Sequence, residues 1–163
     1  NLPEMPRFGM AMVIPAAFDN YTYYGRGPWE NYIDRNHSSH IGIYSSKVAD
    51  QYVPYIRPQE NGNKTDVRWL SLTDENGNGL RIAGLQPLSV TALHNPVENF
   101  DAGVEKKQRH NIDIYPRDEV YLYVDLKQRG VGGDNSWGAF PHRPYRLHDK
   151  TYQYSYIMMP ARP

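Results

Sequence analysis

Cysteine is absent from this chain of 163 residues. Disulfide bonds, thiolate nucleophiles and cysteine-based zinc sites are therefore excluded. The chain also lacks an excess of charge of either sign, because Lys+Arg and Asp+Glu both number 18. It has none of the positive surplus that marks a nucleic-acid-binding domain. No run of eighteen apolar residues occurs, so no membrane-spanning helix is predicted.

The length is typical of one domain and is sufficient to bury a sizeable core. No repeat or linker divides the sequence, so residues 1–163 are predicted to form a single domain. Residues 1–4 carry neither an initiator methionine nor a signal-peptide pattern. We therefore expect a segment cut from a longer protein, and the sequence predicts no particular localisation.

Strand signals occur along the whole chain, whereas helix signals are few. Apolar or aromatic residues alternate two apart, which places them on one face of a strand. This alternation predicts strands at Phe8–Ile14, Val120–Leu126 and Tyr152–Met158. A Gly- and Asn-rich turn at residues 74–79 predicts a hairpin between strands at Val67–Thr73 and Leu80–Ala83. Shorter predicted strands are Ile41–Tyr44, Ser89–Leu93 and Ile112–Ile114.

One helical turn is predicted at Pro96–Phe100, with Asn95 as its N-cap. The 13 glycines and 13 prolines fall mostly between the predicted strands, where turns require them. Many short strands separated by turns are typical of an antiparallel β-sandwich. The predicted fold class is therefore all-β.

Tyrosine is unusually frequent, with 14 tyrosines against 4 phenylalanines. A surface that contacts sugar or another domain would favour such amphipathic side chains. Tyrosine also has good strand propensity, which is sufficient to explain most of them. Two irregular stretches, Gly25–His40 and Tyr52–Thr65, are longer than hairpins need, and such loops are usually functional or interfacial.

The segment Gly130–Gly138 combines four glycines with Asp134, Asn135, Ser136 and Trp137. Glycines allow tight turns, and the indole of Trp137 offers a broad apolar face and one N–H donor. A tryptophan on such a loop suits a sugar, whose C–H faces stack on the ring while its hydroxyls meet polar neighbours. The other interpretation is that the tryptophan packs back over the edge of the sheet, since turn formation alone explains the glycines.

Together with this segment, Gly25–Tyr32 and Pro54–Asn63 form three long motifs in a fixed order. They resemble the C-terminal β-sandwich, or small-chain, domain of the bacterial family 2 glycoside hydrolase β-galactosidases. The resemblance extends from about Phe8 to about Tyr156. It implies a supersandwich of the galactose mutarotase type.

The resemblance also implies that catalysis belongs to a different domain. Family 2 β-galactosidases carry their catalytic glutamates in a (β/α)8 barrel, and nothing in this sequence matches that barrel. We therefore assign no catalytic residue and expect this chain to be an accessory domain of a retaining β-galactosidase, inactive by itself. No metal or cofactor is expected in this chain, because the Mg or Na ions common in the family lie in the barrel domain. The expected partners are the remaining domains and a β-galactoside.

Two groups of site residues follow from the resemblance. Trp137 matches the tryptophan of the family's Gly-Gly-Asp-x-Ser-Trp motif, which contributes to sugar binding, and Asp134 and Ser136 match as well. Asn135 stands where some relatives have Asp. The charged and aromatic residues of the two other motifs are expected to lock these loops to each other and to the barrel; they are Arg26, Trp29, Glu30, Arg57 and Glu60.

Two alternative functions remain open at this stage. An autonomous carbohydrate-binding module would use the same aromatic residues without a partner domain. An aldose epimerase of the mutarotase type would need a histidine acid and a carboxylate base, and only the analogy of fold supports it. His94 and His110 bracket an acidic loop, and their spacing permits either an acid–base pair or two loop ends meeting at a sheet edge.

Overall fold

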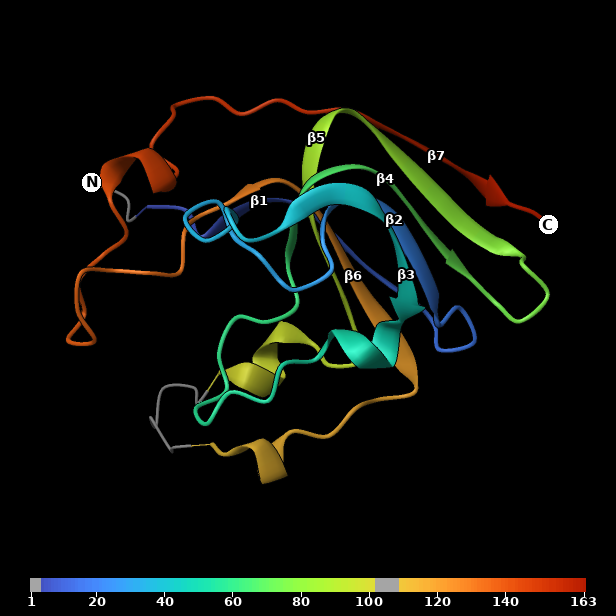
Figure 1. The fold of residues 1–163 in the computed structure, drawn as a ribbon, viewed down its shortest axis with the longest axis horizontal. Helices are drawn as coiled ribbons and strands as arrows, with labels where there is room; N and C mark the ends of the chain where they lie inside the picture. Colours follow the sequence, from blue (N-terminus) through green and yellow to red (C-terminus); the bar gives the residue numbers. More distant parts are fainter. Residues whose placement is uncertain (1–3, 102–108) are drawn as a thin grey trace.

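The computed structural model describes residues 4–101 and 109–163 and consists mainly of β-strands (Figure 1). The strands are β1 (Arg7–Pro15), β2 (Asn20–Gly27), β3 (His40–Lys47), β4 (Lys64–Thr73), β5 (Gly79–Leu93), β6 (Glu119–Gln128) and β7 (Tyr156–Ala161). Short 3-10 helices are η1 (Val48–Gln51), η2 (Val97–Phe100), η3 (Asn111–Asp113) and η4 (Arg143–Tyr145). The all-β prediction is confirmed. Within the described ranges, no helix has the length and apolar character needed to cross a membrane.

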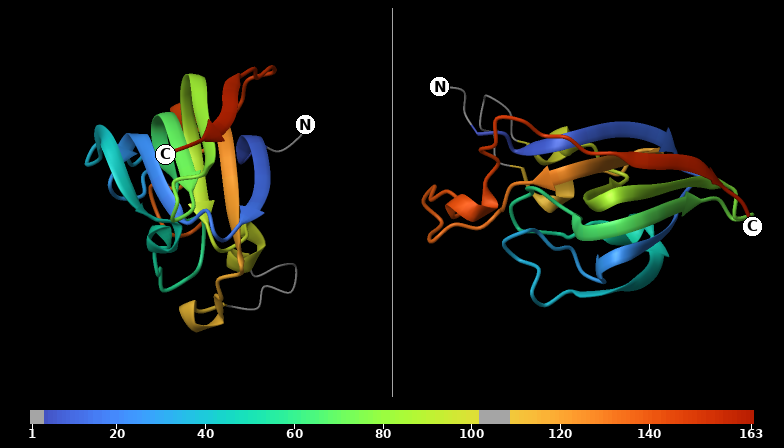
Figure 2. Two further views of the ribbon diagram at one scale, coloured as in Figure 1. Left: turned by 90° about the vertical axis from the view of Figure 1, so that its right-hand side faces the viewer. Right: turned by 90° about the horizontal axis from the view of Figure 1, so that it is seen from above.

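All seven strands belong to one antiparallel sheet, in the order β1-β6-β5-β4-β2-β3, with β7 paired to β5. Strand β5 organises this sheet. Its first part pairs with β7 from Gly79 to Gly84, and its second part pairs with β6 from Ser89 to Leu93. Strand β4 runs along the other edge of both parts. Figure 2 shows the resulting order of strands from β3 at one side to β1 at the other.

Strand β5 bends where it changes from β7 to β6 as its neighbour. At Gly84 an added Cβ would lie 2.3 Å from the carbonyl oxygen of Gln86, so the bend requires glycine there. Pro87 follows and has no backbone N–H to donate to a ladder. A strand that bends between two neighbours turns the corner of a β-sandwich.

The core lies inside this bend and receives side chains from both parts of the sheet. Leu70, Leu72 and Ile82 come from the β7 side, while Val90, Leu122 and Val124 come from the β6 side. All are at most 1% exposed. The fold is therefore an antiparallel sandwich-like arrangement around one main core, with a smaller buried cluster of Leu93, Phe100 and Ile114.

Most predicted strands are found, and the differences are local. Leu80–Ala83 and Ser89–Leu93 are parts of one strand rather than two. The prediction of a strand at Ile112–Ile114 was wrong, because Asp113 accepts a hydrogen bond from the His110 backbone and closes the 3-10 turn η3. The last strand begins at Tyr156, later than predicted.

The predicted turn at Pro96–Phe100 is present as η2, but its predicted cap is not. The side chain of Asn95 donates instead to the Tyr115 carbonyl oxygen, at 2.9 Å. Asn95 thus ties the start of η2 to the chain that precedes β6.

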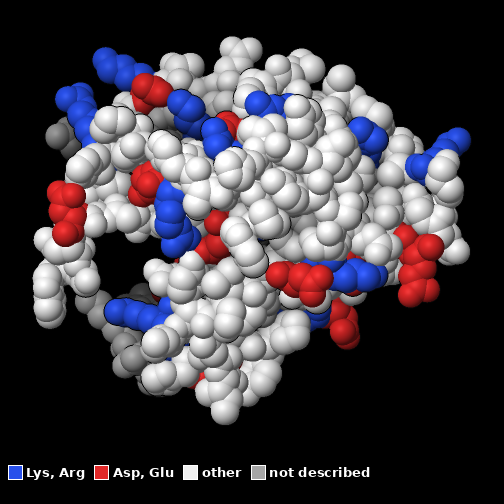
Figure 3. All heavy atoms as spheres, in the orientation of Figure 1, with Lys and Arg blue, Asp and Glu red and all other residues white. Residues whose placement is uncertain are grey.

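Three of the 14 tyrosines are buried. Tyr21 and Tyr23, both 1% exposed, stack with their ring centroids 5.0 Å apart, and Tyr32 is buried as well. Charged side chains of both signs are interspersed on the face in Figure 3. Strand propensity and packing therefore account for Tyr21 and Tyr23 of β2, whereas Tyr32 is buried in the loop that follows β2.

Candidate functional site

The three sequence motifs form loops that approach one another at the side of the molecule away from the β4–β5 hairpin (Figure 1). The Glu30 loop (residues 28–39) connects β2 to β3, and the Tyr55 loop (residues 52–63) connects η1 to β4. The Trp loop (residues 130–138) follows β6. Each loop starts or ends at a strand of the bent sheet, which determines where it lies.

Two buried asparagines join the Glu30 loop to the Tyr55 loop by hydrogen bonds. The Asn31 backbone donates to the Asn63 carbonyl and the Asn63 side chain donates to the Asn31 carbonyl, both at 2.8 Å. The Asn31 side-chain oxygen also accepts from the backbone N–H of Thr65, at 2.9 Å. Because both asparagines are fully buried and hydrogen-bonded, they hold the two loops in one arrangement.

Glu30 makes the closest electrostatic link between the same two loops. Its side chain is 6% exposed, and one carboxylate oxygen accepts from Arg35 at 2.6 Å and from the Tyr55 hydroxyl. The other oxygen accepts from the Gly62 backbone at 2.8 Å and from the Tyr32 hydroxyl at 3.3 Å. Charge-assisted hydrogen bonds of this kind are the stronger ones in proteins. Glu30 thus joins the two loops by hydrogen bonds from Tyr55 and the Gly62 backbone, while its expected contact with a barrel stays a prediction.

The other four residues assigned to an interface have different surroundings. Arg26 pairs with Asp66 and donates to the Ser39 carbonyl at 2.9 Å, so it stabilises the Glu30 loop from within. Glu60 lies 3.9 Å from Arg7. Trp29 is 73% exposed, and Arg57 is also exposed. Trp29 and Arg57 are thus free to contact another part of a larger protein.

The Trp loop is anchored to the rest of the chain near its start. The Gly132 backbone donates to the Asp34 carboxylate, and the Gly130 backbone donates to the Tyr145 carbonyl, each at 2.8 Å. A Cβ at Gly130 would lie 2.4 Å from the Asp34 carboxylate, so only glycine allows this approach. Asp34 lies two residues beyond the Gly25–Tyr32 motif and was not among the predicted site residues.

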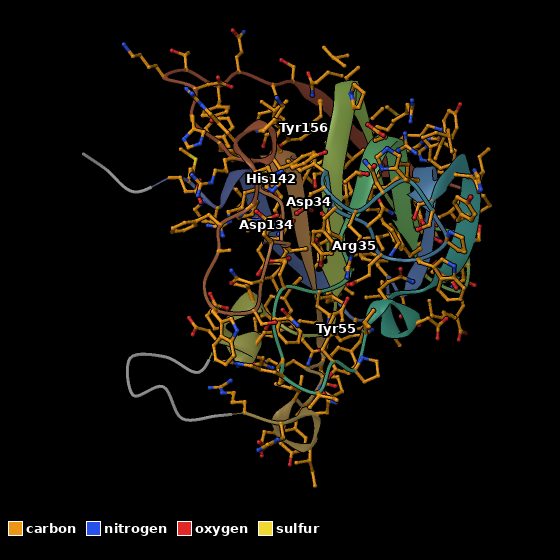
Figure 4. The ribbon with its side chains drawn as sticks, turned by 60° about the vertical axis from the view of Figure 1, so that its left-hand side comes forward. Asp34, Arg35, Tyr55, Asp134, His142 and Tyr156 are labelled. Carbon is orange, nitrogen blue, oxygen red and sulfur yellow. The ribbon has the colours of Figure 1, made fainter. Side chains whose placement is uncertain are left out.

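Beyond this anchor the loop presents its indole to the surface. Asn135 accepts from the Trp137 backbone at 2.8 Å, and Gly138 has a φ of +94°. Trp137 is 93% exposed, so the interpretation that it packs over the sheet edge is wrong. Asp134 pairs with His142 at 2.7 Å, and Ser136 is exposed beside Trp137. Figure 4 shows Asp134 and His142 next to each other.

A cleft of about 240 Å³ lies where the three loops meet. We call it the three-loop cleft. It is lined by Tyr32, Asp34, Arg35, Tyr55, Gln59, Glu60, Val131 and Gly132. Figure 4 shows Asp34, Arg35 and Tyr55 in succession along this side of the molecule. The cleft therefore connects the anchor of the Trp loop with the Glu30 network.

Asp125 of β6 lies behind this region and is nearly inaccessible. Its side chain is 2% exposed, and the Arg7 guanidinium donates to it at 2.9 Å. Burial, with a smaller contribution from the negative charge of Glu60, raises the pKa of Asp125 to about 6 against the opposing effect of Arg7. Burial disfavours the charged carboxylate more than the single guanidinium favours it.

This raised pKa predicts a pH dependence of stability. The folded chain holds the Asp125 proton more tightly than the unfolded chain, so stability falls as pH rises from about 4 through about 6. We expect the free energy of unfolding of the chain, relative to that of Asp125→Asn, to fall over this range in urea titrations. A difference that rises with pH would mean that Arg7 dominates and lowers the pKa instead.

The histidines do not form the acid–base pair that their spacing allowed. One ring nitrogen of His94 lies 2.8 Å from the Glu119 carbonyl oxygen and the other lies 3.2 Å from the Asp19 carboxylate. His110 instead precedes the turn η3. Over residues 4–101 and 109–163, no three His, Asp or Glu side chains are grouped so as to hold a metal ion. The ions that the resemblance assigns to the barrel remain a prediction.

Comparison with known proteins gives one consistent family. The family described as "Beta galactosidase small chain" matches residues 1–158. A β-galactosidase of Priestia megaterium is 41% identical over 160 residues, which are 98% of this chain and 15% of that protein. The β-galactosidase BgaC of Bifidobacterium adolescentis is 35% identical over 90% of this chain and 14% of its own length. A β-galactosidase of Vibrio cholerae is 34% identical over 94% of this chain and 14% of its own length.

Proposed function

The chain belongs to the β-galactosidase small-chain family, and we propose that it is an accessory domain of a retaining β-galactosidase. In this proposal the Trp loop contributes Trp137 to the sugar-binding pocket, and the first two loops pack against the catalytic barrel. The observation that carries the proposal is the 93% exposed indole of Trp137 on a loop anchored through Asp34.

The exposure of Trp137 supports a role completed by another domain. The Trp137 side chain is almost fully exposed, so it contributes little to folding and its indole is available for a contact outside this chain. An indole offers a flat apolar face for the C–H groups of a sugar and one N–H donor for a hydroxyl. Asp134 and Ser136, both exposed beside it, supply further hydrogen-bonding groups in the proposed pocket.

The outer sides of the first two loops support packing against a partner. Trp29 of the Glu30 loop is 73% exposed and Ile56 of the Tyr55 loop is 88% exposed. Large apolar side chains exposed on neighbouring loops are typical of surfaces that another domain covers. The chain spans about 15% of the length of the curated relatives it matches, which leaves ample chain to provide that cover.

The proposal predicts that this chain alone does not hydrolyse galactosides. Because the acid and nucleophile carboxylates belong to the barrel, purified chain should release no product from a chromogenic β-galactoside above the blank, while the full-length enzyme does. Hydrolysis that survives stringent purification and disappears on mutation of this chain would overturn the proposal.

Titration of the isolated chain with galactose or lactose separates the proposal from an autonomous carbohydrate-binding module. One stacking face is a fraction of a binding site, and association must first overcome several kcal/mol of lost translational and rotational freedom. We expect no saturable binding in the millimolar range (Kd above ~1 mM, weaker than about −4 kcal/mol). Tight binding that requires Trp137 would favour the module.

A further inference from the structure

One oxygen of the Asp34 carboxylate is engaged and the other is not. The Gly132 backbone donates to Oδ2 at 2.8 Å, which anchors the Trp loop. Oδ1 is buried and has no hydrogen-bond partner among the described residues. Asp34 lines the three-loop cleft. A buried carboxylate oxygen without a partner carries a substantial desolvation cost, which a donor would relieve if docking of another domain shifted the Asp34 side chain so that Oδ1 faced the cleft.

The charges around the cleft favour a positive occupant. Two of its charged lining residues, Asp34 and Glu60, are acidic, and one, Arg35, is basic. The charge of Arg35 is already matched by Glu30, which it contacts at 2.6 Å.

Glu60 is not neutralised as closely as Glu30. The nearest cation is Arg7, at 3.9 Å, and Arg7 binds Asp125 much more closely, at 2.9 Å. Asp34 and Glu60 therefore face the cleft with an excess of negative charge.

The size and shape of the cleft suit one side chain. Its volume of about 240 Å³ lies below the range of roughly 300–1,000 Å³ that is usual for sites of drug-sized ligands. The Tyr55 hydroxyl is held by Glu30 and Arg35, which restricts the orientation of its ring. An aromatic ring beside carboxylates is a favourable surrounding for a guanidinium or ammonium group.

We propose that the three-loop cleft is a socket for one positively charged side chain, an arginine or a lysine, supplied by the remainder of the enzyme. This cation enters the cleft near Glu60 and binds Oδ1 of Asp34 once docking has turned that carboxylate toward the cleft. The inference rests on the proposed function, because the occupant comes from the domains that this chain packs against. It adds the chemistry of the contact: the same aspartate that anchors the Trp loop also binds the neighbouring domain, so docking and the position of Trp137 are coupled.

The direct test is a structure of the full-length enzyme determined without sugar. We expect a lysine or arginine nitrogen from outside this domain at about 2.7–2.9 Å from Oδ1 of Asp34. A cleft that holds only water or an apolar side chain in this structure would overturn the proposed cation site. A sugar hydroxyl in the cleft of a second structure, determined with galactose, would also overturn it. By contrast, a small-chain domain that makes no contact with the barrel would overturn the proposed function itself.

A double-mutant cycle in the full-length enzyme tests whether the contact contributes energy. Asp34→Asn keeps an acceptor for the Gly132 N–H but removes the charge, and the exposed Asp118→Asn makes the same chemical change as a control. We expect Asp34→Asn to lower the urea midpoint more than Asp118→Asn, and to have no such effect once the cation is replaced by methionine. If Asp34→Asn lowers the urea midpoint equally with the cation present and with methionine in its place, the proposal is overturned. If Asp34→Asn does not fold, Glu60→Gln replaces it in the same cycle.

Discussion

Glu30→Ala should destabilise this chain by about 3 kcal/mol, at the lower end of the range for breaking a buried ion pair. The lower end applies because Arg35 is half exposed and regains water when its partner is removed. The Gly62 N–H and the hydroxyl of the buried Tyr32 lose their acceptor at the same time. The Glu30 and Tyr55 loops should then remain joined through Asn31 and Asn63 but lose the Glu30 contacts, and urea unfolding followed by circular dichroism measures the loss.

Two variants make this result specific. Glu30→Gln keeps one acceptor but directs an N–H₂ group toward donors, so its loss of stability should be smaller yet clear. Glu75→Ala, at the exposed tip of the β4–β5 hairpin, should change stability by no more than about 0.5 kcal/mol. A cost below about 1 kcal/mol for Glu30→Ala would mean that the loops are held by the buried asparagines alone.

Trp137→Ala in the full-length enzyme should raise the Michaelis constant roughly five- to tenfold, equivalent to about 1–1.4 kcal/mol of lost stacking. The turnover number should change little, because the indole contacts the sugar in the ground state and the transition state alike. The free energy of unfolding should stay within about 0.5 kcal/mol, as for other exposed positions. A buried tryptophan would behave oppositely and cost about 3–5 kcal/mol of stability on truncation.

Tyr115→Ala is the matched control, since the Tyr115 ring is also largely exposed, at 68%, but lies outside the three loops. We expect its Michaelis constant to remain that of the wild type. A Trp137→Ala enzyme with an unchanged Michaelis constant and a large loss of stability would return Trp137 to a purely structural role.

The features that could be predicted from the sequence are those set by local patterns. Alternation in Phe8–Ile14 and Val120–Leu126 located β1 and β6, and the Gly-rich turn located the β4–β5 hairpin. Period-2 alternation needs no tertiary information, because successive side chains of a strand point to opposite faces. The exposure of Trp137 was one of two interpretations of its glycine-rich loop.

Features that depend on distant contacts could not be predicted in this way. Strand β5 is continuous through Gly84 and Pro87, two residues that usually interrupt a strand, because β4 pairs with the segments on both sides of them. Glu30 and Gly62 are 32 positions apart, and only the folded sheet brings them together. Asp34 was missed for the same reason, since Gly132 is 98 positions away.

The central claim, that this domain presents Trp137 to a sugar held mainly by the barrel, is tested most directly by a structure of the full-length enzyme with a bound galactoside. The account predicts that the indole ring of Trp137 lies over a sugar ring at van der Waals distance, about 3.5–4.0 Å between carbon atoms. An indole that makes no sugar contact while the galactoside occupies the pocket would contradict it.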